Sequence, residues 1–172
     1  MAIIAVREPT PDDVPGVRRV ARRGWEAAYG DVLDPATIER ALEEWYAPAF
    51  VRESVEREDV VHLVAVDESG RNGAVVGDAG GWLPDADDPE RGVVGALYVD
   101  PDRRGAGIGT RLFERALDTR REQGVTRVTI RVLAENAVGR SFYESRGFEV
   151  AAESADDLFG ETRPVVTYAS EI

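Results

Sequence analysis

Residues 97–110 join an apolar run to an amphipathic pattern through a turn that holds three glycines and two arginines. The apolar run predicts a strand, and residues 108–117 repeat apolar side chains at the helical period. Glycines let consecutive backbone N–H groups point into one concavity, and the start of the helix adds free amides and a positive dipole end. The order strand, glycine turn, helix therefore predicts a cradle for a diphosphate and requires a fold in which a strand end meets a helix start.

Two common phosphate motifs do not fit this turn. A P-loop contains Gly-Lys followed by Ser or Thr, and the chain has no lysine. A dinucleotide fingerprint needs G-x-G-x-x-G, but counting from Gly105 places Thr110 at the third glycine. P-loop and nicotinamide chemistry are therefore disfavoured.

Strand and helix patterns alternate along the chain and predict one mixed α/β sheet. The expected strands are residues 3–6, 60–66, 74–83, 93–99, 125–133, 148–152 and 165–169. The expected helices are residues 14–28, 35–45, 108–123 and 137–146, with a further turn or two at 50–55. Asn72-Gly73 predicts a hairpin turn. Residues 1–172 are expected to form a single domain with a twisted sheet of about six to seven strands and about four helices.

The chain has no cysteine, which excludes disulfides and a cysteine nucleophile, and no metal site is expected. Its 33 acidic and 21 basic residues give a net charge of -12, which opposes nucleic-acid binding. The sequence has neither an apolar run of about 18 residues nor the layout of a signal peptide. A cytoplasmic protein without membrane contact is therefore expected.

The acidic residues are scattered along the whole chain. An acidic surface attracts cationic substrates such as amines. It is also typical of halophilic archaea, in which carboxylates keep protein surfaces hydrated at high salt. The scatter favours the halophilic interpretation, so charge alone does not identify the substrate.

The glycine turn is the first of two motifs in the second half of the chain. Residues 104–109 fit R-x-x-G-x-G and follow L-x-V-x-P, while Asn136 precedes a Phe-Tyr and a Gly-Phe pair in residues 142–148. The two motifs together resemble the GCN5-related N-acetyltransferase (GNAT) family. The resemblance covers residues 93–152 well, and this part is expected to form the cofactor-binding half.

The resemblance implies acetyl-CoA as the acyl donor, bound in a cleft between two splayed central strands. The pantetheine arm would pair with the backbone of Leu97, Tyr98 and Val99. Asn136 would reach the same arm or cap its helix, and both roles are compatible. The diphosphate would contact Arg104, Gly105, Ala106, Gly107, Ile108, Gly109 and Thr110.

The resemblance also implies direct attack of a primary amine on the thioester through a tetrahedral intermediate, with a backbone N–H near Val99 stabilising the oxyanion. Tyr143 would act as general acid on the departing thiolate, because a phenol with a pKa of about 10 is neutral and can donate at pH 7. The alternative is that Tyr143 belongs, with Phe142, to a buried helix face.

The general base stays open. Some relatives carry a glutamate on the central strand, but residues 93–99 contain no carboxylate. Asp78, Glu90 or a chain of waters could substitute. His62, the single histidine, lies in an apolar strand and is interpreted as structural.

The acceptor is also open between a polyamine, an amino acid, another small amine and a protein N-terminus. Trp25 and Tyr29, together with Tyr46, could wall the acceptor site between the first two helices and the loop before the last strand, or pack in the core. A homodimer through the last strands is common in similar proteins. A non-catalytic acyl-CoA-binding module that regulates a partner is the alternative function.

Overall fold

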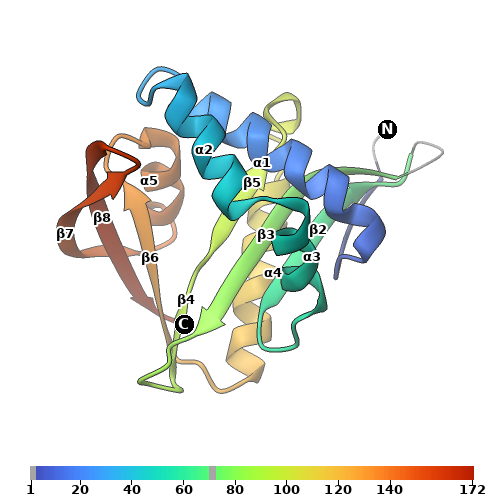
Figure 1. Cartoon of the computed structure of the whole chain (residues 1–172). Coiled ribbons are helices and arrows are strands. Elements are labelled where there is room, and N and C mark those ends of the chain that lie inside the picture. The colour runs from blue at the N-terminus through green and yellow to red at the C-terminus, as the bar shows by residue number, and fades with distance from the viewer. Residues whose placement is uncertain (1–2, 70–72) are drawn as a thin grey trace.

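The computed structural model describes residues 3–69 and 73–172, in which five α-helices and an eight-stranded mixed sheet form one domain (Figure 1). The elements are, in chain order, β1 (Ile4–Arg7), the 3-10 turn η1 (Pro11–Asp13), α1 (Val14–Tyr29), α2 (Pro35–Trp45), α3 (Pro48–Glu56), β2 (Val61–Asp67), β3 (Ala74–Pro84), β4 (Arg91–Val93), β5 (Ala96–Val99), the 3-10 turn η2 (Pro101–Arg103), α4 (Ile108–Glu122), β6 (Arg127–Leu133), α5 (Ala137–Glu144), β7 (Glu149–Leu158) and β8 (Glu161–Glu171).

The strands follow the order β1-β2-β3-β4-β6-β8-β7, and β5 pairs with β3 next to β4. Neighbours are antiparallel except β4 and β6, which run parallel. Helices α1, α2 and α3 cover one face of the sheet, and α4 covers the other (Figure 1). Because helices cover both faces of β2 and β3, every side chain of β2 is buried.

An aromatic cluster holds α4 and α5 against the sheet. Phe113 of α4 is fully buried, and its ring lies 5.5 Å from Trp82 of β3, 5.7 Å from Tyr143 of α5 and 5.8 Å from Phe148. Edge-to-face aromatic contacts stabilise by about 0.5–1.5 kcal/mol beyond the area they bury. The position of α5 beside the sheet therefore depends on this cluster.

The strand expected at residues 93–99 is two strands, and this is a correction to the sequence prediction. β4 pairs with both β3 and β6, whereas β5 pairs only with β3. The last bond to β6 runs from the Val94 N–H to the Thr129 carbonyl at 2.9 Å. β5 and β6 then diverge from this junction towards the top of Figure 1. The expected splay of the central strands is confirmed.

Three glycines make this break possible. A Cβ on Gly95 would lie 2.2 Å from the Gly80 carbonyl oxygen and 2.5 Å from the Gly81 carbonyl carbon, so the two backbones come closer than any side chain allows. Gly81 adopts φ +72°, in the left-handed region that favours glycine. The strand therefore leaves β6 at the point where glycines meet.

The expected fold class is confirmed. The sheet has one strand more than expected because of the break after Val93, and residues 48–56 form a helix of their own rather than a turn or two. Part of the expected Asn72-Gly73 turn lies outside the described residues. Among the described helices, none is both long and apolar enough to cross a lipid bilayer.

The close approach at Gly95 predicts a large loss of stability for Gly95→Ala. The added methyl group meets rigid backbone, and overpacking of this kind costs about 1–3 kcal/mol or more. Gly92→Ala is the matched control, because its Cβ would meet a Val125 methyl group at an ordinary 3.4 Å. Urea unfolding of both variants measures the difference. Equal losses would show that the approach at Gly95 does not limit the fold.

Candidate functional site

A cleft of about 640 Å³ opens where β5 and β6 diverge. Its floor and walls come from α1, β5, the glycine turn, the start of α4, β6 and α5. Of the residues predicted from the sequence, those lining it are Tyr29, Leu97, Tyr98, Val99, Arg104, Gly105, Gly107, Ile108, Gly109, Thr110, Asn136 and Tyr143. Segments far apart in the chain therefore meet in one cleft.

The β5 backbone is free on the cleft side. The Asp100 N–H donates to the Val76 carbonyl at 2.9 Å, so Asp100 and Val76 form a hydrogen-bonded pair. Such pairs alternate along an antiparallel ladder, so the Tyr98 backbone faces β3. The N–H and C=O groups of Leu97 and Val99 therefore point towards the cleft. An extended ligand could pair with them as an added strand does.

The glycine turn leaves open space in front of its amides. Gly105 and Gly107 have φ +81° and +77°, and a Cβ on either would meet nothing within 4 Å. Gly107 is the N-cap of α4 and has no side chain to bond the first helical N–H groups. The first intrahelical donor there is the Arg111 N–H, which bonds the Gly107 carbonyl at 3.0 Å. The preceding amides are left for a ligand, and the helix dipole favours an anion.

Three arginines surround this turn, and one is already paired. Arg103 binds Asp67 at 2.7 Å. Arg146 stacks on the Phe142 ring at 3.5 Å and donates to the Thr110 hydroxyl. In the described part of the chain Arg104 forms no ion pair. Arg104 and Arg146 therefore leave positive charge at the turn, where a diphosphate would need it.

Tyr143 lies on the inner side of α5 with 7% of its surface exposed, and it lines the cleft. Burial raises the pKa of its phenol, so Tyr143 is neutral at pH 7 and keeps a proton to donate. The same ring packs against Phe113, Phe148 and Tyr168. The two alternatives considered for Tyr143, a packing role and a place in the site, are thus compatible in geometry.

Asn136 links the two sides of the cleft. Its Oδ1 accepts a hydrogen bond from the Gly139 N–H at 2.9 Å and caps α5. Its Nδ2 donates to the Tyr29 hydroxyl of α1 at 3.2 Å. Asn136 therefore holds α5 near α1 while lining the cleft.

Two predicted residues lie elsewhere. Ala106 sits at the exposed tip of the turn and does not line the cleft. Trp25 is buried, with its ring 5.9 Å from that of Trp45, and Trp45 lies 5.6 Å from Phe159 between the last two strands. The expected meeting of the first helices with the last loop exists, but its aromatic rings fill the space between them.

Several lining residues were missed by the sequence analysis. Ile130, Arg131 and Val132 of β6 form the opposite wall, and Phe142 and Arg146 of the second motif flank the turn. The β6 residues carry only an alternating apolar pattern, which marks a strand and not a site. Phe142 and Arg146 both lie within the second motif, which is the one sequence signal that could have identified them.

The base candidates separate in space. Glu90 lies in the loop before β4, its carbonyl accepts the Thr126 N–H at 2.7 Å, and it does not line the cleft. Asp78 is 1% exposed on β3, and its carboxylate contacts the His62 ring on the face opposite α4. The structure thus pairs two residues that the sequence analysis considered separately.

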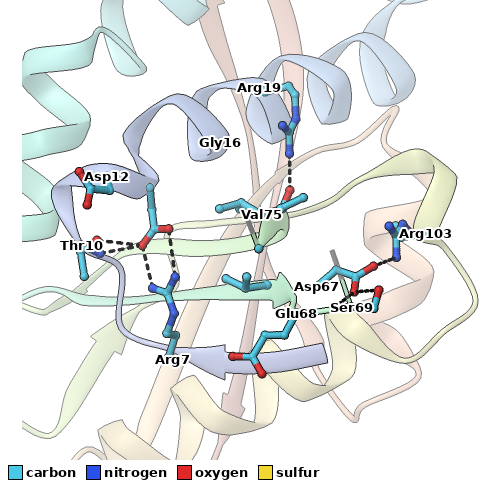
Figure 2. Close-up of a pocket in the computed structure, with 14 residues that line it drawn as sticks. Arg7, Thr10, Asp12, Gly16, Arg19, Asp67, Glu68, Ser69, Val75 and Arg103 are labelled. Atoms are coloured by element: carbon cyan, nitrogen blue, oxygen red, sulfur yellow. Dashed lines mark hydrogen bonds and ion pairs between the residues drawn. The ribbon is translucent and has the colours of Figure 1, made fainter. Parts of the chain in front are cut away.

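A larger, polar hollow of about 840 Å³ lies on another part of the surface, between α1 and the ends of β1 to β3 (Figure 2). Its arginines already have partners: Arg7 binds Asp13 at 2.7 Å and Arg103 binds Asp67 (Figure 2). Arg19 donates to the Val75 carbonyl. Because its charged side chains pair with one another, this hollow would attract an anion less strongly than the cleft does.

Known proteins of similar structure share the whole architecture. The PaiA N-acetyltransferase of Thermoplasma acidophilum, solved in complex with coenzyme A, superposes with a TM-score of 0.81 at 22% identity over 99% of each chain. At this identity the likeness shows the fold.

Similar sequences carry N-acetyltransferase names. A mycothiol acetyltransferase of Beutenbergia cavernae is 45% identical over 76 residues, which are 43% of this chain and 25% of that protein. A spermidine N(1)-acetyltransferase of Thermoplasma acidophilum is 23% identical over 93% of this chain and 97% of its own. The chain thus spans about a quarter of the first relative and nearly all of the second. Residues 20–148 match the acetyltransferase (GNAT) family, and because this match covers most of the chain, the protein belongs to that family.

Proposed function

We propose that this protein transfers an acetyl group from acetyl-CoA to a primary amine. The observation that carries the proposal is the cleft beside β5, where free strand backbone leads to free amides at the start of α4. The strand edge suits an extended amide-containing arm, and the amides suit a diphosphate. Coenzyme A contains both parts in that order. Family membership and the names of the relatives support the same activity.

Each part of the cleft has a proposed role. Leu97 and Val99 would hold the arm by backbone hydrogen bonds, and Arg104, Gly105 and residues 107–110 would hold the diphosphate. Acetyl-CoA supplies a thioester whose carbonyl carbon is open to attack by an amine. The Val99 N–H, which faces the cleft, would stabilise the developing oxyanion, a contribution of about 3 kcal/mol. Residues 93–152 would thus form the donor-binding half.

Tyr143 is proposed as the general acid. Its phenol is held neutral by burial and lines the cleft, so it can donate a proton to sulfur as negative charge develops there. Asn136 would fix the position of α5 through its cap and its bond to Tyr29.

Two further features of the chain, its net charge and its exposed edge strand, support additional proposals. The surface carries a net charge of -12 without lysine, as expected of a protein adapted to high salt in a halophilic archaeon. β7 is an edge strand with an exposed face, where a second copy could pair to give a homodimer.

An amine panel tests the activity. We expect release of free thiol from acetyl-CoA in the presence of at least one class among polyamines, amino acids and peptides, with more activity at high salt than at low salt. The chain has no cysteine, so every thiol detected comes from the donor. Binding of coenzyme A without thiol release across the panel would favour a non-catalytic acyl-CoA-binding module instead.

The glycine turn predicts a selective loss of donor binding in Gly107→Ala. The new methyl group would project into the concavity, and a tenfold rise in the Kd for coenzyme A corresponds to about 1.4 kcal/mol. Gly124→Ala is the matched control, because Gly124 has φ +88° and open space but lies at the far end of α4. Both variants should lose about 1–2 kcal/mol of stability from backbone strain. Calorimetry that shows equal Kd values for the two variants would contradict the proposed cradle.

The role of Tyr143 predicts that Tyr143→Phe lowers kcat about 100-fold with an unchanged Kd for coenzyme A. Tyr168→Phe is the control: its hydroxyl bonds Arg140 and Glu144 and does not line the cleft, so its loss costs about 1 kcal/mol of stability without lowering kcat. Steady-state kinetics measure both. An unchanged kcat in Tyr143→Phe would leave Tyr143 only a packing role.

A further inference from the structure

A third and smaller cavity, of about 220 Å³, lies on the face of β3 and β5 that α1 and α3 cover. Its polar side chains include Ser54 of α3, His62 of β2 and Asp78 of β3. Neither family motif includes any of the three. They come together because alternate residues of β2 and β3 face α1 and α3 rather than α4.

These three side chains form a hydrogen-bonded chain. The His62 Nε2 lies 2.5 Å from the Asp78 Oδ1, and the Ser54 hydroxyl oxygen lies 3.2 Å from the His62 Nδ1. The side chains of His62 and Asp78 are 6% and 2% exposed. An ionised carboxylate only accepts hydrogen bonds, so the geometry assigns the proton of neutral His62 to Nε2. The Nδ1 lone pair is then directed towards Ser54, where it can accept a proton.

The backbone makes room for this imidazole. A Cβ on Gly80 would lie 3.0 Å from the His62 Nε2 and 3.2 Å from two ring carbons, closer than nearly all real contacts. A side chain at position 80 would require the His62 ring to shift by a few tenths of an ångström. The glycines that break the sheet therefore also seat the His62 ring.

The cavity and the cleft meet at one strand. Ala96 lines both of them, and its partner across the ladder is Gly80, which touches His62. Gly81 and Gly95 lie beside this pair and carry no side chain, while the ring of Tyr98, which lines the cleft, packs on Tyr46 of the cavity. A molecule in the cavity and one in the cleft would approach each other at this strand, because α1 lines both.

The other residues that line the cavity indicate which kind of ligand it could bind. Trp45 and Phe50 are 41% and 54% exposed at the cavity, and Tyr46, Val17 and Val51 line it further. The volume equals that of about seven water molecules. Aromatic faces beside a carboxylate suit a cation with a compact apolar body. A small primary ammonium ion fits this lining, whereas a folded protein surface does not.

We propose that this cavity binds the acceptor as a compact aromatic or aliphatic amine, and that His62, oriented by Asp78, removes the proton that the amine must lose. The inference rests on the proposed acetyl transfer. His62 would be the catalytic base and Asp78 a positioning residue.

The proposed transfer conserves protons and bonds. The ammonium ion gives one proton to the Ser54 hydroxyl oxygen as that hydroxyl passes its own proton to the His62 Nδ1, and the nitrogen lone pair forms the new C–N bond to the acyl carbon. The C–S bond breaks, and the sulfur takes a proton from Tyr143. The nitrogen then loses its second proton, which restores the proton of Tyr143. His62 then returns its proton to water through Ser54.

The pH dependence follows from the groups that face the imidazole. Asp78 on β3 and Ser54 on α3 contact the ring, the charge of Asp13 in η1 acts on it without contact, and Tyr46 at the end of α2 lines the same cavity. Burial opposes protonation of His62, but Asp78 outweighs it, so the pKa of His62 lies above its ordinary value. A base must be deprotonated, so kcat/KM should fall as pH falls through this pKa.

Kinetics give the first test, with the best amine of the panel as substrate. His62→Gln should lower kcat/KM about 100-fold at neutral pH and remove the acidic limb of the profile, with an unchanged Kd for coenzyme A. Asp78→Asn should lower the rate and shift that limb to lower pH. Thr37→Ser, a buried polar position on α2 outside the cavity, is the control. A wild-type rate and profile in folded His62→Gln would overturn the proposal.

The single histidine gives a second test that needs no variant. We expect 2-phenylethylamine, added to the protein loaded with coenzyme A, to shift the NMR signals of the His62 ring and to lower its pKa. Acetylation of 2-phenylethylamine without any shift of these signals would overturn the inference and leave the proposed function intact. Absence of acetyl transfer to every amine would overturn the proposed function, whereas a shift of the ring signals would still support an amine-binding cavity.

Discussion

The contact on which the site depends is the approach of one backbone to another at Gly95. With a Cβ at that position only 2.2 Å from the Gly80 oxygen, the chain can follow this path only without side chains. The path takes β5 away from β6 while β4 stays paired with it. The backbone N–H and C=O groups of an unpaired strand edge need other hydrogen-bond partners. Here these groups face a cleft. A break in the sheet thus becomes the place where a ligand can complete it.

The other parts of the site are arranged around this break. β5 leads through η2 into the glycine turn, so the free amides of α4 lie at the far end of the same cleft. The aromatic cluster around Phe113 fixes α5 on the opposite side and thereby sets the position of Tyr143. The aromatic contacts that pack the core therefore also place Tyr143, the proposed general acid, in the cleft.

Ion pairs neutralise several of the arginines in the described part of the chain. Although the chain has 21 arginines and no lysine, the ion pairs Arg7–Asp13, Arg23–Asp100 and Arg103–Asp67 neutralise those around the polar hollow and η2. Arg104 and Arg146 stay beside the glycine turn. On the opposite face, the buried pair of His62 and Asp78 adds a titratable group next to the same break. Donor and acceptor sides would then differ in charge: cationic for the diphosphate, anionic for the amine.

The sequence by itself determined the order of elements, the glycine turn and the second motif, because glycine content and apolar period are local properties. It therefore predicted part of the cleft, namely nine residues between Leu97 and Thr110 together with Tyr29, Asn136 and Tyr143. It did not determine the break after Val93, since an apolar run looks the same whether one edge is paired or free. Nor did it predict the contact between His62 and Asp78, because the two residues are 16 positions apart, on strands whose register is shifted by irregularities. Which side chains share a face after such a shift is decided only by tertiary pairing, because one residue of register reverses the face of every side chain.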